Sequence, residues 1–192
     1  MKWSTQLKTA ATADPVSVVE AKAHLRVTDT ADDNYIGTLI AAATQWAQTV
    51  TGRQLVTATW FWHGDGFPSQ IVLPYPPLQS VTEITYYDSA NALQVLSEDA
   101  YEVSTAYEPA VIQPVSGQAW PSTYSRQDAV RVEYVAGYGP AAAVPAGIKQ
   151  AILLLVGHWY ENREEVVAGV MGTLPVAADA LLRQYWHGWE FQ

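Results

Sequence analysis

The sequence predicts an α+β protein in which a small helical bundle, formed by N- and C-terminal helices, carries an inserted antiparallel β-rich segment. Apolar residues recur with helical spacing towards both ends, short β-branched and aromatic runs lie between them, and the charge differs between these parts. We expect N-terminal helices in residues 1–54 and the β-rich insertion in 55–139. The C-terminal helices and tail, 140–192, should pack with 1–54 as one helical unit.

The N-terminal part carries local helix signals. Ser17 followed by Glu20 is a capping-box pattern, which predicts a helix from Val18 to about Arg26. A second helix should begin after Asp32–Asp33, because acidic side chains favour a helix N-terminus, and should end at Gly52. Its apolar residues recur at steps of three and four and predict one buried stripe: Ile36, Leu39, Ile40, Ala43, Trp46, Ala47 and Val50.

The C-terminal part contains two more predicted helices. One runs from about Ala146 to Arg163 and is nearly all apolar from Ile148 to Val156, so it should be central to the core. The other opens at Pro175 and extends to about Tyr185. The stripe of the second helix should pack on a matching stripe of the third: Ile148, Ile152, Leu155, Val156 and Trp159.

Seven short strands are predicted in the middle of the chain. The clearest are Leu55–Trp62, Val81–Tyr87 and Ala129–Val135, which are β-branched or aromatic or alternate well. Shorter candidates are Ile71–Leu73, Leu93–Leu96, Tyr101–Val103 and Val111–Gln113. Frequent prolines separate these runs and keep the strands short.

The composition excludes several classes of protein. None of the 192 residues is a cysteine, which excludes a disulfide scaffold, a thiolate metal site and a cysteine nucleophile. The formal net charge of -9, from ten basic and nineteen acidic residues, argues against binding nucleic acid through its phosphates. Residues 1–13 show no secretory signal and no apolar run could span a bilayer, so we expect synthesis in the cytoplasm and no membrane partner.

Motifs for catalysis or cofactor binding are weak. His158 and Glu161 have a spacing compatible with two metal ligands, but no third ligand is evident, and we interpret them as a polar helix end. Ser116-Gly117 lacks the glycine two residues before the serine that a nucleophile elbow needs, and no phosphate-binding loop is found. We therefore expect no catalytic, metal or cofactor-binding residues, no cofactor and no enzyme activity.

The middle of the chain is strongly acidic. Residues 57–139 hold nine carboxylates and two cations, Arg126 and Arg131, whereas residues 1–56 are neutral. We interpret these carboxylates as an acidic surface that faces solvent, a neighbouring subunit or a channel. A pair of them acting as the acid and base of a hydrolase is a less favoured alternative. The candidates are Glu83, Asp88, Glu98, Asp99 and Glu102.

Aromatic residues are abundant, with eight Trp and eleven Tyr. Two tryptophans share one face of a predicted strand, where they could belong to the core, to a subunit interface or to a sugar-stacking surface. The chain end, Leu181–Gln192, is also aromatic, and such side chains need burial on the same subunit or in a partner. The candidate interface residues are Trp60, Trp62, Tyr185, Trp186, Trp189 and Phe191.

Five stretches, taken in order, resemble the tailed-phage head–tail connector family, also called head-completion or adaptor proteins. They are PVSVVEAKAHLRV (Pro15–Val27), DDNYIGTLIAAATQWAQTVTGRQLVTATW (Asp32–Trp60), LPYPPLQSVTEITYYD (Leu73–Asp88), VRVEYVAGYG (Val130–Gly139) and VPAGIKQAILLLVGHWYENRE (Val144–Glu164). The resemblance implies a non-enzymatic structural protein of a bacteriophage or gene transfer agent, located in the virion at the head–tail junction.

The same resemblance implies a set of partners. Twelve copies would form a ring below the portal protein, extend the DNA channel and give the next tail or stopper protein a docking surface. The net acidity suits a conduit, because negative walls repel phosphates and let DNA pass without specific binding. The alternative function is a carbohydrate-binding or adhesion module that uses the aromatic-rich β segment.

Overall fold

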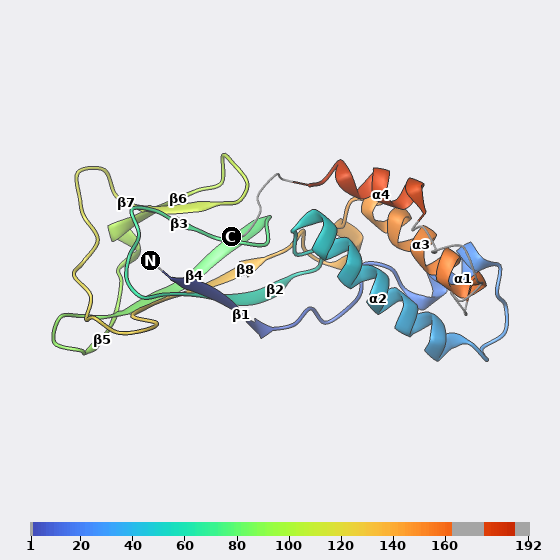
Figure 1. The fold of residues 1–192 in the computed structure, drawn as a ribbon, viewed down its shortest axis with the longest axis horizontal. Coiled ribbons are helices and arrows are strands. Elements are labelled where there is room, and N and C mark those ends of the chain that lie inside the picture. The colour runs from blue at the N-terminus through green and yellow to red at the C-terminus, as the bar shows by residue number, and fades with distance from the viewer. Residues whose placement is uncertain (1, 163–174, 187–192) are drawn as a thin grey trace, which may run out of the picture. The chain divides into compact units, whose positions relative to one another are not determined.

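A computed structural model describes residues 2–162 and 175–186 of the chain (Figure 1). The chain divides into two compact units. The β unit contains residues 2–11 and 57–138, and the helical unit contains residues 12–56, 139–162 and 175–186. The predicted α+β class is confirmed, because helices and antiparallel strands occupy separate parts of the chain.

The β unit contains two antiparallel sheets, a larger one in the order β1-β2-β8-β4-β5 and a smaller one in the order β3-β7-β6. The larger sheet is formed by β1 (Trp3–Thr9), β2 (Ala58–Gly64), β8 (Val130–Ala136), β4 (Leu78–Tyr87) and β5 (Leu93–Val95). The smaller is formed by β3 (Ile71–Val72), β7 (Val111–Pro114) and β6 (Tyr101–Ser104), and a 3-10 helix, η1 (Glu98–Ala100), precedes β6. All seven predicted strands are present, with shifted ends.

Strand β1 was not predicted, because the sequence analysis placed only helices in residues 1–54. It lies at the edge of the larger sheet and pairs with β2, so that Trp3 is opposite Gly64 and Leu7 is opposite Trp60. Only Thr5 is partly buried, and the other six side chains are exposed. The run does alternate, with Trp3, Thr5 and Leu7 on one side and Ser4, Gln6 and Lys8 on the other, but the prediction interpreted this part of the chain as helical and missed the strand.

The core of the β unit lies between its two sheets. Strand β8 alternates along its length, and Val132 and Tyr134 are among the side chains that it buries. The smaller sheet adds Ile71 and Ile112 to the same cluster. The buried Tyr134 hydroxyl donates a hydrogen bond of 3.1 Å to the Pro74 carbonyl, and burial raises its pKa well above the usual value. The opposite side of the larger sheet, here called the outer face, is therefore free to carry polar groups.

The helical unit is formed by α1 (Val18–Leu25), α2 (Asp33–Thr51), α3 (Ala146–Glu161) and α4 (Val176–Arg183), with a 3-10 turn, η2 (Ala141–Ala143), before α3. All four predicted helices are present. Helices α2 and α3 contact each other, as predicted, and each also contacts α4. The buried side chains of the two predicted stripes are Ile36, Leu39, Ile40, Ala43 and Ala47 in α2 and Ile148, Ile152, Leu155 and Val156 in α3.

Three residues of these stripes, two of them tryptophans, are less buried than predicted, and one of the three is the partly buried Val50. Trp46 is exposed and Trp159 is only partly buried. An apolar stripe about 100° wide includes positions at its margins, where a large ring reaches the surface. The stripe therefore predicted the helix contact correctly but not the burial of its largest side chains.

The predicted capping box at the start of α1 is present. The Ser17 Oγ accepts a hydrogen bond of 3.2 Å from the Glu20 N–H, and the Glu20 carboxylate accepts one of 2.8 Å from the Ser17 N–H. The same carboxylate forms an ion pair of 2.7 Å with Lys149 on α3. The hydrogen bond from Lys149 and those from Ser17 lower the pKa of Glu20 to about 2. At the end of α2, Gly52 adopts the left-handed conformation with φ 68°, as its predicted position requires.

Replacing a buried leucine of α3 should destabilise the helical unit. Leu155→Ala removes a fully buried side chain and should lower the free energy of unfolding by about 2–5 kcal/mol. Val19→Ala, at a position that is 77% exposed on α1, should change it by less than about 0.5 kcal/mol. Urea denaturation measures both values, and equal losses would contradict a core position for Leu155.

Removing the Glu20 charge should produce a pH-dependent loss of stability. The folded pKa lies below the unfolded value of 4.5, so the stabilisation is present above that pH and is lost as the pH falls towards 2. The side chain is 45% exposed, so Glu20→Gln should cost about 0.5–1 kcal/mol at pH 7. Denaturation between pH 7 and pH 3 measures the difference in free energy of unfolding between the unaltered protein and Glu20→Gln. This difference should become smaller below pH 4.5. Glu98→Gln, at an exposed position on η1, is the control, and its free energy of unfolding should match that of the unaltered protein at every pH.

Candidate interaction site

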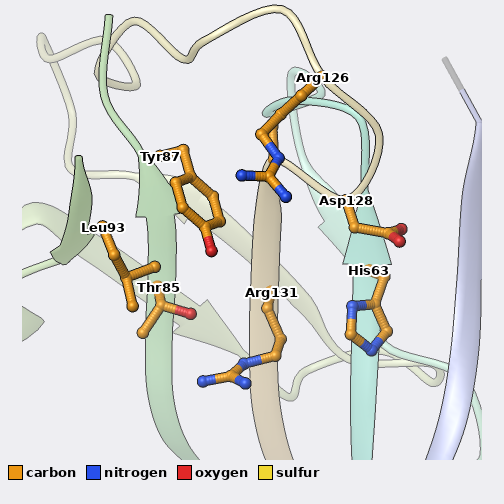
Figure 2. A pocket seen from close by; sticks show the side chains of 8 residues that line it. His63, Thr85, Tyr87, Leu93, Arg126, Asp128 and Arg131 are labelled. Carbon is orange, nitrogen blue, oxygen red and sulfur yellow. The ribbon is translucent and has the colours of Figure 1, made fainter. Parts of the chain in front are cut away.

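Charged side chains gather in a pocket on the outer face of the larger sheet. The pocket has a volume of about 220 Å³ and lies over β2, β4, β5 and the start of β8 (Figure 2). It contains both cations of residues 57–138, Arg126 and Arg131, and we call it the arginine pocket. Its lining residues are His63, Thr85, Tyr87, Leu93, Arg126, Asp128, Ala129 and Arg131.

Arg126 is held over the pocket by an aromatic ring. Its guanidinium carbon lies 3.9 Å from the centroid of the Tyr87 ring, which is a favourable cation–π distance. Its Nε donates to the Gln127 carbonyl at 3.3 Å, and its Nη1 lies 3.5 Å from the Asn91 side-chain oxygen. Arg126 forms no ion pair with a carboxylate in the part of the chain that the structure describes.

Arg131 extends from the central strand β8 over the Phe61 ring, at 4.9 Å from the ring centroid. The Glu83 carboxylate lies 3.8 Å away, and both side chains are 40% exposed, so this ion pair is weak. Figure 2 shows Arg131 between Thr85 and the His63 ring. The Nε2 of His63 is buried without a hydrogen-bond partner among the described residues.

This arrangement is suited to binding an anionic group. Two guanidinium groups share the pocket with one carboxylate, Asp128, and a guanidinium matches a carboxylate or phosphate with two parallel N–H donors. The pocket has no second carboxylate among its lining residues, so it lacks the pair that acid–base hydrolysis needs. The sequence signal that could have indicated the pocket is that its two arginines are the only cations in residues 57–139.

Two of the five predicted surface carboxylates have partners within the chain. Glu83 faces Arg131, as described above. Asp88 accepts hydrogen bonds from the Ala92 N–H at 3.0 Å and from the Gln94 side chain at 2.8 Å, which lower its pKa. Asp88 therefore shapes the turn between β4 and β5.

The other three predicted carboxylates have free side chains. Glu98 and Asp99 lie on η1, and Glu102 lies on β6, where it is opposite Gln113. All three are exposed and form no ion pair or hydrogen bond through their side chains with the described residues. We call them the acidic cluster.

The two tryptophans of β2 differ in their burial. Trp62 is 2% exposed and belongs to the core of the β unit, so it is not an interface residue. Trp60 is partly buried, and its ring centroid lies 4.3 Å from that of Tyr75. Alternation along β2 places both rings on the inner side of the sheet, where burying large apolar rings is favourable.

The aromatic chain end is described only in part. Tyr185 is partly buried in the helical unit, where its carbonyl accepts a hydrogen bond of 2.5 Å from the Arg53 Nε and its ring lies close to Gly147. Trp186 is 53% exposed. The other two candidate interface residues, Trp189 and Phe191, lie outside the described residues.

Within residues 2–162 and 175–186, no group of three or more His, Cys, Asp or Glu side chains could hold a metal ion. None of the described helices is both long and apolar enough to cross a membrane.

Comparison with solved structures finds the same fold in gene transfer agent (GTA) particles. A chain from the neck of an empty GTA particle, computed with C6 symmetry, is 20% identical with a TM-score of 0.79, and the match covers 98% of this chain and 97% of that one. A chain from the virion of a native GTA particle gives 20% identity and a TM-score of 0.77, with 97% of both chains covered. A chain from the neck of a native GTA particle, computed with C12 symmetry, gives 22% identity and a TM-score of 0.68, with 100% of this chain and 98% of that one covered.

The family model for head completion proteins matches residues 16–172. A comparison with curated proteins finds no match. The fold and the family match define a structural protein of the virion rather than an enzyme. The chain belongs to the head completion protein family, as the resemblance in its sequence indicated.

Neighbouring aromatic residues at the chain end should differ in their effect on stability. Tyr185→Ala removes a partly buried ring from the helical unit and should lower the free energy of unfolding by about 2 kcal/mol. Trp186→Ala should change it by less than about 0.5 kcal/mol, because that ring is mostly exposed. Denaturation of the purified variants checks both values. A larger loss for Trp186→Ala would mean that its ring is part of the core.

Proposed function

We propose that the protein is a head–tail connector of a phage or a phage-like particle. In this proposal, twelve copies form a closed ring below the portal protein at the head–tail junction. The ring extends the DNA channel and provides the docking surface for the next tail or stopper protein. The observation that carries the proposal is the family match over residues 16–172, together with a fold shared along the whole chain with proteins of GTA necks.

The charge of the β unit supports a role as a conduit. Residues 57–138 carry nine carboxylates and two arginines, and several carboxylates are exposed. A channel with such walls repels phosphate groups, which keeps DNA from adhering as it passes. Both arginines lie in one pocket, so the described part of this segment offers no track of cations along which a duplex could bind.

Exposed apolar side chains support extensive contacts with partners. Leu93 and Val95 on β5, Tyr107 in the loop after β6, and Val176 and Trp186 in the helical unit are all exposed. Apolar groups of this size are often covered in an assembly. A ring subunit has neighbours on two sides and partners above and below, which accounts for exposed apolar groups in both units.

Loss of the protein should stop assembly after the head has been filled. Particles made without it should contain packaged heads that carry the portal but lack tails, because the docking surface is missing. Electron microscopy and a count of tailed particles measure this, and expression of the unaltered chain in trans should restore tails. Tailed, infective particles made in the absence of the protein would contradict the proposed function.

A further inference from the structure

The arginine pocket has donors that the chain itself does not use. Arg126 forms no ion pair within the described residues, and the nearest carboxylate oxygen to Arg131 is 3.8 Å away. The buried Nε2 of His63 has no hydrogen-bond partner in the same part of the chain. Arg126 is exposed and Arg131 is 40% exposed, so both guanidinium groups are accessible to an anionic group of a partner, which each can bind with two parallel N–H donors.

The pocket fits separate carboxylates better than a nucleic-acid backbone. Asp128 lines it, and Glu83 and Glu133 lie on the same outer face, where Glu133 pairs with Lys8 at 2.6 Å. A chain of phosphates would meet these carboxylates on either side of the arginines and would need further cations. The Arg126 guanidinium lies over Tyr87 and that of Arg131 reaches towards Glu83, four residues away along β4, so each guanidinium can take a separate carboxylate on a short aliphatic stem. Tyr87 and Leu93 line the pocket and can contact such a stem.

The acidic cluster has the charge that complements the arginine pocket. Glu98, Asp99 and Glu102 are exposed and have no partner in the described chain. Strand β6 belongs to the smaller sheet, which covers the inner face of the larger one (Figure 1). Glu102 and the opposite Gln113 are both exposed, so they point away from the shared core. Glu102 and the arginine pocket therefore lie on opposite sides of the β unit, and Glu98 and Asp99 precede Glu102 on η1.

We propose that the arginine pocket of one copy binds a carboxylate from the acidic cluster of the next copy. Two different complementary surfaces on opposite sides of a subunit produce a head-to-tail contact, which closes into a ring when the rotation between copies allows it. The inference rests on the proposed function, which supplies the ring, and it names the contact that joins neighbouring β units.

Cross-linking through introduced cysteines tests this contact directly, because the chain has none of its own. Gln127→Cys lies beside Arg126, and Gln113→Cys lies opposite Glu102. Both replaced side chains are exposed and uncharged, so neither charged surface is altered. With a short bismaleimide, an equal mixture of the two variants should give covalent dimers, and the double variant should give a ladder up to the full ring. Each single variant alone should remain monomeric in denaturing gels.

Charge reversal provides the second test. Reversing the pocket with Arg126→Glu and Arg131→Glu, or the cluster with Glu98→Lys, Asp99→Lys and Glu102→Lys, should weaken ring association by roughly tenfold or more. Mixing the two reversed proteins should restore association, because each copy then has a partner of opposite charge. Glu108→Lys, an exposed charge reversal outside the cluster, is the matched control and should leave association unchanged. Unchanged melting of each free variant shows that the fold is intact.

The outcomes separate this inference from the proposed function. Sedimentation of the purified chain and of necks released from particles reports the ring, and cross-linking reports the contact. Rings that neither cross-link at these positions nor respond to charge reversal would overturn the contact and leave the connector role standing. Absence of any ring, in solution and in particles, would overturn the connector ring itself. Intact rings of the pocket variant that lose affinity for double-stranded DNA would assign the pocket to phosphate and overturn the carboxylate proposal.

Discussion

The β unit depends on strand β8, which pairs with β2 on one side and with β4 on the other. Successive side chains of a strand point to opposite faces, so this one strand supplies the core with Val132 and Tyr134 and the outer face with Arg131 and Glu133. A slip of one residue in its pairing would exchange these sets and bury two charges. The cost of that burial specifies the register and, with it, the position of the arginine pocket.

Electrostatics give the β unit two different surfaces. Three of its four cations lie on one face: Arg126 and Arg131 share one pocket, and Lys8 pairs with Glu133. The carboxylates of the acidic cluster remain unpaired elsewhere. A subunit with separated charges of opposite sign can recognise its own copies while its net charge of -9 repels DNA. Both properties suit the ring that we propose.

Local signals were sufficient for most of the secondary structure. The Ser17–Glu20 capping box, the apolar stripe of α2 and Gly52 predicted helix positions because these patterns act within a few residues of the chain. Alternation, together with β-branched and aromatic runs bounded by turn residues, predicted β8 and six further strands for the same reason. Strand β1 was not predicted, because a short exposed edge strand is held mainly by pairing with β2, whose residues are 50 to 61 positions away along the chain.

The sequence by itself determined the α+β class, the helix pairing and the family, because periodicity, caps and ordered motifs are properties of the chain. Only the tertiary structure decided which side chains are available for contacts. Trp62 is buried in the core, whereas Trp186 is exposed. Glu83 forms an ion pair and Asp88 accepts hydrogen bonds within the chain, whereas Glu102 is unpaired among the described residues. The tertiary structure also brought Arg126 and Arg131 together with His63, which is more than sixty residues away along the chain. Such proximity arises from strand pairing, and no local pattern of residues encodes it.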